Sequence, residues 1–349
     1  MKWIHSIAIA SLAFVSINSA CAQSSVKLYG LVNAGVGGYQ LAGANRIKAV
    51  SSGDMSTSFW GVSGSEDLGG GLKANFALES FVAVDTGAAG RFTGDAMFAK
   101  NAYVGLSNNN YGQLRVGRNT SQMFVSLLLF NSFGDSFGFS PTLLHYYLDG
   151  RDIPISKTAR LQNDTAWRNS VTYISPVMSG VRLNLQSAAG EGVGKSSYAA
   201  TAQYFGDPFS ATVAYQSVGT DAAAPTNGRR EKTVNVGASY DFRVAKLYAQ
   251  YGQIDDESYG SKLRLYDISA EVPINGGGKI LAAWGHSKVR TGTFAGIIPL
   301  LTDSVHKTLS LGYDHALSKR TDIYAVYMND KIDGLRTGNS YAVGVRHNF

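Results

Sequence analysis

The stretch Phe209–Gln216 reads FSATVAYQ, and the stretch Val234–Asp241 reads VNVGASYD. In both, an apolar side chain alternates with a polar or small one. A period of two residues places the two sets on opposite faces of a β-strand. The same alternation recurs in Val181–Gln186, Thr308–Asp314 and Tyr341–Phe349. The pattern therefore predicts a protein built from strands.

Short turn sequences separate many of these strands, for example Asp67–Gly71 and Asn108–Gly112. Longer polar loops such as Gly219–Arg230 alternate with the short turns. We count about sixteen strand candidates between Val26 and Phe349, or about 20 residues for each strand with its connection. This spacing suits strands of about ten residues that cross a bilayer, with short turns at one rim and long loops at the other.

The chemistry of the two strand faces decides between a soluble sandwich and a membrane barrel. Only 16% of the 349 residues are charged, whereas soluble domains usually carry about 25%. The charged residues of the strand candidates share the polar face. They are Lys73, Glu79, Arg115, Arg182 and Arg346. The apolar face therefore meets lipid and the polar face lines water, which only a closed barrel allows. We predict an all-β transmembrane antiparallel β-barrel of about sixteen strands.

Residues 1–22 are expected to be a cleaved signal peptide. A basic start and a short apolar stretch precede the small-residue pattern Ala20–Ala22. The alternative is a lipoprotein signal acylated at Cys21, although Asn18 stands where such signals usually carry leucine. Cleavage would leave residues 23–349 as one exported barrel domain without cysteine.

Residues 120–160 form the one long irregular segment, and a compact fold seldom keeps such a loop without a function. It contains the apolar stretch Met123–Phe130 and the Tyr/Leu-rich stretch Leu143–Leu148. One interpretation is an external cap with its own small core. We favour the other, a loop folded into the lumen that narrows it, because the apolar content needs something to pack against.

The sequence gives little support for bond chemistry. The stretch Ala189–Ser196 (AGEGVGKS) fits a nucleotide-binding loop, but the strand-like stretch Ser197–Phe205 follows it where a helix is required. The histidines after the signal peptide are dispersed and show no metal-ligand or triad spacing. The net charge of +6 is spread without a basic run. We expect no enzymatic activity, cofactor, metal or nucleic-acid partner, with a barrel lipase or protease as the alternative.

Several short stretches at both ends and in the middle of the chain carry a resemblance. They are Val26–Gly30 (VKLYG), Gly64–Gly71 (GSEDLGGG), Ala102–Leu106 (AYVGL), Tyr111–Asn119 (YGQLRVGRN), Asn169–Pro176 (NSVTYISP), Leu317–Tyr324 (LSKRTDIY) and Gly344–Phe349 (GVRHNF). By these stretches the chain resembles the Gram-negative general-diffusion porins, in particular those of Burkholderia, Bordetella and Neisseria relatives.

The resemblance implies a sixteen-stranded barrel that assembles as a homotrimer, with its third external loop, here residues 120–160, folded inward as a constriction. It also implies a basic cluster on the wall that faces acidic residues on the loop. The wall positions correspond to Phe59, Lys100 and Arg168, and Phe59 replaces an arginine of the family. Asp135 is the candidate acidic partner.

The expected function is passive diffusion of small hydrophilic solutes and ions across the outer membrane. Mild anion preference is expected, because the candidate wall cations Lys100, Arg115 and Arg168 outnumber the one carboxylate placed opposite them. One alternative is a solute-specific channel guided by the aromatic stretch Phe133–Tyr147. Another is a barrel adhesin or receptor that acts through its external loops.

The expected partners follow from the resemblance. They are further copies of the chain, outer-membrane lipid and lipopolysaccharide, and the outer-membrane assembly machinery. The terminal Phe349, on an alternating strand, resembles the signal that this machinery reads.

Overall fold

The computed structural model describes residues 25–147, 164–192, 194–219, 229–257, 260–291 and 304–349. The predicted signal peptide, residues 1–22, lies outside the described residues. So do residues 148–160 of the predicted constriction loop. The boundary predicted between residues 22 and 23 therefore stays a prediction.

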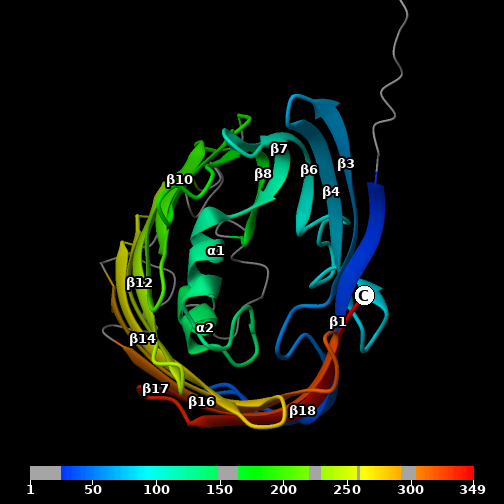
Figure 1. Cartoon of the computed structure of the whole chain (residues 1–349). Helices are drawn as coiled ribbons and strands as arrows, with labels where there is room; N and C mark the ends of the chain where they lie inside the picture. The colour runs from blue at the N-terminus through cyan, green and yellow to red at the C-terminus, as the bar shows by residue number, and fades with distance from the viewer. Residues whose placement is uncertain (1–24, 148–163, 193, 220–228, 258–259, 292–303) are drawn as a thin grey trace, which may run out of the picture.

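The described chain forms a single antiparallel sheet that closes on itself as a ring (Figure 1). The first and last strands pair with each other from Leu31 opposite Asn348 to Gly38 opposite Tyr341. The strands are β1 (Ser25–Tyr39), β2 (Ile47–Ser52), β3 (Phe59–Gly69), β4 (Leu72–Ala83), β5 (Ala88–Ala89), β6 (Asn101–Asn108), β7 (Gly112–Thr120), β8 (Ala166–Ile174), β9 (Val181–Ala188), β10 (Ser197–Phe205), β11 (Phe209–Gly219), β12 (Arg230–Asp241), β13 (Lys246–Asp256), β14 (Ser261–Ile274), β15 (Gly278–Thr291), β16 (Val305–Ala316), β17 (Thr321–Ile332) and β18 (Gly338–Asn348).

The wall of the barrel has sixteen strand positions. Strands β2 and β3 act as two halves of one position, because β2 pairs with residues 34–39 of β1 and β3 pairs with residues 25–31. The two-residue β5 pairs only with the end of β4. The prediction of a closed antiparallel barrel of about sixteen strands is confirmed. Closure leaves no free sheet edge in the wall.

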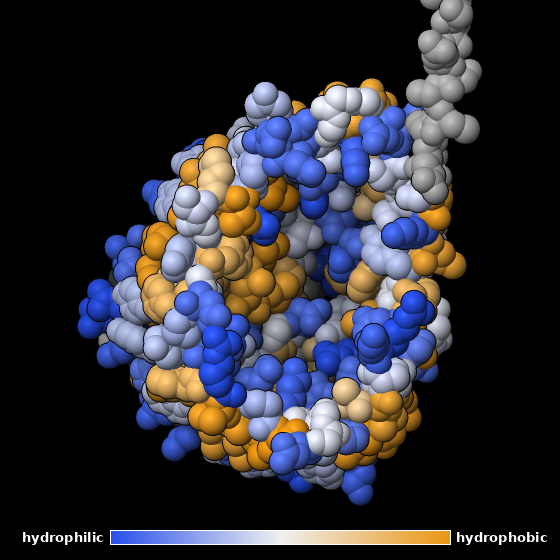
Figure 2. All heavy atoms as spheres, viewed as in Figure 1, coloured by the Kyte–Doolittle hydropathy of each residue, from blue (hydrophilic) through white to orange (hydrophobic). Residues whose placement is uncertain are grey.

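Burial along the strands is the reverse of that in a soluble protein. In β9, Leu183 and Leu185 are 47% and 55% exposed, whereas Asn184 and Gln186 are 1% and 3% exposed. Val213 of β11 and Val234 and Val236 of β12 point outward in the same way. Figure 2 shows hydrophobic residues on the outer side of the ring and a central hollow bordered in part by hydrophilic residues. The apolar face therefore meets lipid, as the alternation predicts.

Two short helices, α1 (Gln122–Leu129) and α2 (Pro141–Tyr147), lie inside the ring (Figure 1). Helix α1 packs on β9 to β12 and α2 packs on β14 to β16. The Ser121 hydroxyl caps α1 by accepting from the Phe124 amide. Neither helix, nor any other helix among the described residues, is long and apolar enough to cross a membrane.

Residues 121–147, here called the inner segment, join their apolar side chains to the barrel wall. Met123, Leu127 and Leu143 form one buried cluster with Ile254 of β13 and Leu263 of β14. The apolar content of this segment is thus used in packing against the wall, as the sequence suggests. That the whole of residues 120–160 constricts the lumen stays a prediction.

Candidate functional site

The inner segment divides the lumen wall into two parts. The inward faces of β10 to β16 lie behind α1 and α2 and are called the covered wall, and β9 lies at its edge. The inward faces of β1, β3, β4, β6 and β7 are not packed against either helix and are called the open wall (Figure 1). Solutes in the lumen meet the open wall directly, so its charged side chains are the first candidates for ion selection.

The predicted cation Lys100 lies in a compact cluster on the open wall. Its Nζ atom donates to Glu79 Oε2 at 3.0 Å and lies 4.1 Å from the centre of the Phe59 ring. Tyr29 donates to the other carboxylate oxygen of Glu79 at 2.7 Å, and the Asn101 amide also donates to this carboxylate. Lys100 is therefore held by a carboxylate and an aromatic face, which reduces its effect on ions in the lumen.

The structure brings Phe59 and Lys100 into contact, and their role at a constriction stays a prediction. The phenylalanine cannot supply the guanidinium that the family has at this position. Its ring instead binds the ammonium of Lys100 through a cation–π contact. Phe59 thus contributes an aromatic face that positions the ammonium of Lys100.

Arg115, on β7, is a different kind of cation. Its guanidinium lies 4.6 Å from the centre of the Tyr103 ring and donates to Gln113 Oε1 at 2.7 Å. No carboxylate pairs with it among the described residues. Register places Arg115 opposite Gly105 of β6. Arg115 thus keeps its full charge facing the lumen.

Arg182, on β9, repeats this arrangement and was not among the predicted site residues. Its guanidinium lies 5.3 Å from the centre of the Phe205 ring, and its Nε atom is buried without a hydrogen-bond partner. The described residues contain no carboxylate in contact with it. The signal that could have found Arg182 was its inward parity, shared with Asn184 and Gln186.

Asp135, in the inner segment, contacts the wall through Ser56. The Ser56 hydroxyl donates to Asp135 Oδ1 at 2.7 Å and accepts from Arg346 at 3.1 Å. Arg346 also pairs with Asp314 and Asp322 at 3.1 Å. Burial raises the pKa of Asp135, against the opposing effects of the Ser56 hydrogen bond and the Arg346 charge. The acidic partner on the loop is therefore linked to Arg346 rather than in contact with Lys100.

Arg168 and Phe349 lie apart from these clusters. Arg168 is exposed, in the irregular part of β8 where the pairing with β7 shifts between Gly117 and Asn119. The described residues offer it no hydrogen bond or ion pair. Phe349 follows β18, and its backbone exchanges two hydrogen bonds with Gly30 at 3.1 and 3.2 Å. The roles predicted for both residues stay predictions.

A second ion-pair network lies at the two ends of the inner segment, near the end of β7 and the start of β8. The sequence did not reveal it. Arg91 pairs with Asp164 at 2.6 Å and with Asp95 at 2.8 Å. Arg118, near the end of β7, also pairs with Asp164. Arg91 and Asp95 are four residues apart, but Arg118 and Asp164 are distant from them in sequence, and no motif marks the set. The network fixes the start of β8 to the end of β7.

Among the described residues no three His, Cys, Asp or Glu side chains come together as metal ligands. The site offers instead fixed charges, aromatic faces and amides along a water-filled path. Such groups can orient and select solutes without forming bonds to them.

Comparisons with known proteins agree with this geometry. Residues 8–335 match the family model described as Gram-negative porin. The chain is 31% identical to outer membrane porin protein 32 of Delftia acidovorans, over 97% of this chain and 94% of that protein. It is 25% identical to an outer membrane porin protein of Bordetella pertussis, over 95% of this chain and 96% of that protein.

Among solved structures, an anion-selective porin from Comamonas acidovorans superposes with a TM-score of 0.75 at 24% identity. The match covers 94% of this chain and all of that one. Fold, family model and relatives thus lead to the same conclusion. The chain belongs to the Gram-negative porins and is a general diffusion channel of the outer membrane.

Proposed function

We propose that this porin passes small hydrophilic solutes and ions with a mild preference for anions. The observation that carries the proposal is the pair Arg115 and Arg182, two guanidiniums facing the lumen with no carboxylate partner among the described residues. The carboxylates Glu79, Asp314 and Asp322 each lie within 3.1 Å of a cation. Charges without a partner dominate the local potential, so these two arginines raise the anion concentration along the path.

The relative from Comamonas acidovorans is described as anion-selective, which supports the same direction of selectivity. In our proposal Lys100 and Arg168 contribute less than Arg115. Lys100 is paired and Arg168 is exposed outside the charged clusters. Asp135 and the inner segment narrow the path from the opposite side.

The experiment that tests the proposal is the reversal potential of the purified protein in a planar lipid bilayer under a salt gradient. The wild type should show anion preference, and Arg115→Gln and Arg182→Gln should each reduce it. Lys232→Gln is the matched control, because Lys232 pairs with Glu257 at 2.6 Å on the outward face. Cation preference of the wild type, or equal effects of all three substitutions, would refute the proposal.

We further propose that the channel performs no bond chemistry and works as a homotrimer after cleavage of residues 1–22. Its other partners would be outer-membrane lipid, lipopolysaccharide and the assembly machinery, which would read Phe349. The relatives it matches are porins, which supports these expectations. Cross-linking of the purified protein, mass analysis of its mature N-terminus and folding assays with Phe349 deleted test them one by one.

The alternative of a solute-specific channel loses its main sequence support. The aromatic side chains expected to guide solutes are used for packing within the inner segment. Phe124, Phe137 and Tyr147 contact one another with ring centres 5.7 to 6.0 Å apart. Tyr146 and Tyr147 are only 3% and 7% exposed.

A further inference from the structure

Helix α2 is attached to the covered wall by a histidine pair. His145 Nε2 lies 2.9 Å from the Thr308 hydroxyl of β16. The His145 ring stacks on the His306 ring, with centres 4.2 Å apart and planes inclined by 29°. His306 in turn pairs with Asp330 of β17 at 2.5 Å. Two imidazoles, one from the helix and one from the wall, therefore form the centre of this contact.

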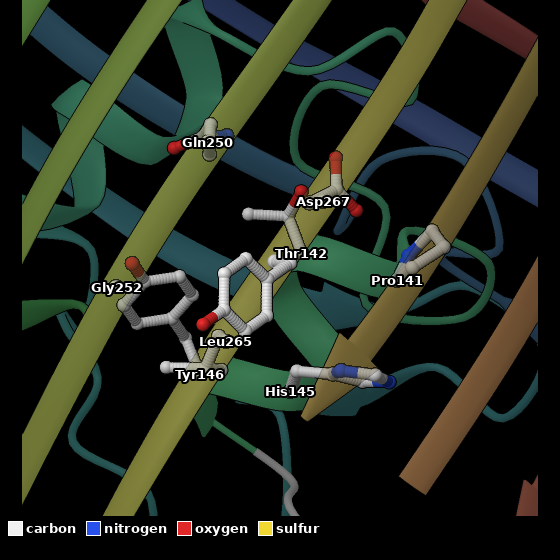
Figure 3. A pocket seen from close by; sticks show the side chains of 9 residues that line it. Pro141, Thr142, His145, Tyr146, Gln250, Gly252, Leu265 and Asp267 are labelled. Carbon is white, nitrogen blue, oxygen red and sulfur yellow. The ribbon is translucent and has the colours of Figure 1, made fainter. Parts of the chain in front are cut away.

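A cavity of about 10 Å³ lies beside this pair, between α2 and strands β13 and β14 (Figure 3). It has room for about one water molecule. Three of the side chains that line it are at least 94% buried and carry polar atoms with no hydrogen-bond partner: Thr142, His145 and Asp267. The contact between α2 and the wall thus combines apolar packing through Leu143 and Leu144 with a polar part that is incompletely satisfied.

The surroundings of His145 oppose a positive charge on its ring. Burial, followed by the charges of His306 and His286, holds the pKa of His145 well below its usual value. Among the described residues, the titratable groups on the inward faces around the contact are Asp267 on β14, His306 on β16 and Asp330 on β17, with Tyr146 and Tyr147 on α2 itself. His286 and Lys288 on β15 and Lys307 on β16 have the outward parity of their strands.

Asp267 and Asp330 are the only carboxylates in that set, and neither contacts His145 directly. Asp330 already binds His306, and Asp267 lies across the cavity. A proton on His145 would therefore place a positive charge in a buried ring stack with no carboxylate in direct contact with His145. Such a charge is strongly unfavourable in a buried site.

We propose that the His145–His306 stack is an acid-sensitive latch, which holds α2 against the barrel wall and releases it into the lumen when His145 takes up a proton. A histidine whose pKa is lowered in the docked state stabilises docking above about pH 6.5 and loses that contribution as the pH falls below it. Because α2 is bounded by the wall behind it, release moves it toward the hollow and narrows the path. The expected result is a smaller conductance in acid.

Hydrogen exchange followed by mass spectrometry, on the full-length mature protein in detergent micelles, tests the latch directly. After correction for the pH dependence of intrinsic exchange, the protection of the α2 amides should fall about tenfold or more between pH 7.5 and pH 5.0. The α1 amides serve as an internal reference and should keep their protection. Unchanged protection of α2 across this range would overturn the proposal.

Two variants and a control assign the effect to the histidine pair. In His145→Gln the protection of α2 and the single-channel conductance should become independent of pH between 7.5 and 5.0. In His306→Gln, which keeps a donor for Asp330, the acid response should be weaker because the ring that stacks on His145 is gone. His315→Gln alters an outward-facing histidine and should behave as the wild type. An acid response of equal size in His145→Gln and the wild type would assign it to other groups and refute the latch.

Discussion

The covered wall and the open wall of this barrel are built from the same alternating strands but use their inward side chains differently. On the covered wall, amides and hydroxyls are buried and bind the inner segment. Gln250, for example, donates to the carbonyls of Leu127 and Phe130 at 3.3 and 3.0 Å. On the open wall, Arg115 and the Glu79–Lys100 pair remain accessible to the lumen. Inward parity thus fixes where a side chain points, and the inner segment decides whether it acts in packing or in permeation.

The largest effect on stability is expected when the attachment of α1 to the covered wall is weakened. Leu127 is fully buried there, and Leu127→Ala should lower the free energy of unfolding by about 2–5 kcal/mol through lost packing. Denaturant titration of the refolded protein measures the change. Leu129→Ala is the matched control, because Leu129 lies on the same helix and is 42% exposed. Equal losses in both variants would show that burial on the wall does not stabilise α1.

A smaller effect is expected when one polar contact of the covered wall is removed. Gln250→Leu leaves the Phe130 carbonyl without this donor, while the Leu127 carbonyl keeps the Asn131 amide, and it should cost about 1–3 kcal/mol of unfolding free energy. On the open wall, Gln113→Leu removes the donor to Asn75 and the acceptor for Arg115, both of which water can replace, so its cost should be smaller. The same denaturant titration compares the two. A larger cost for Gln113→Leu would contradict the division of the wall.

A substitution on the open wall should change ion selectivity more than it changes the stability of the protein. Glu79→Gln removes the carboxylate that binds Lys100 at 3.0 Å and leaves a free ammonium at the lumen. Taking about 0.2–1 kcal/mol for such a pair, the anion-to-cation permeability ratio should rise by about 1.5- to 5-fold. Reversal potentials in a salt gradient measure this ratio. A ratio that stays constant or falls would mean that Lys100 does not face the ion path.

The strands could be predicted from the sequence because alternation is a local property. The predicted stretch Phe209–Gln216 lies within β11, which extends to Gly219. The docking of the inner segment could not be predicted in the same way, because it depends on contacts between distant residues. Gly237 leaves space for Phe130, and Gly252 leaves space for the Tyr146 hydroxyl. Nothing in the sequence near either glycine indicates which distant aromatic ring will fill that space.

The charged residues also show what strand parity can and cannot predict. Parity correctly placed Arg115 and Arg182 on the inward face, because β7 and β9 are regular around them. Parity says nothing about partners, so it could not distinguish the paired Lys100 from the unpaired Arg115. It also fails where a bulge intervenes, because an extra residue reverses the faces that follow.

Substitution of Arg168 should give the smallest effect on ion selectivity. It tests whether parity fails beside the shifted pairing of β7 and β8. Arg168 lies in β8 where the pairing with β7 is shifted, and its side chain is exposed. If Arg168 borders the ion path, Arg168→Glu should shift the reversal potential toward cations by less than Arg115→Glu and by more than Lys232→Glu. The distance of Arg168 from the open-wall clusters and the screening of exposed charges by salt limit its influence. A shift equal to that of Lys232→Glu would remove Arg168 from the path and leave Arg115 and Arg182 as the unpaired cations that select for anions.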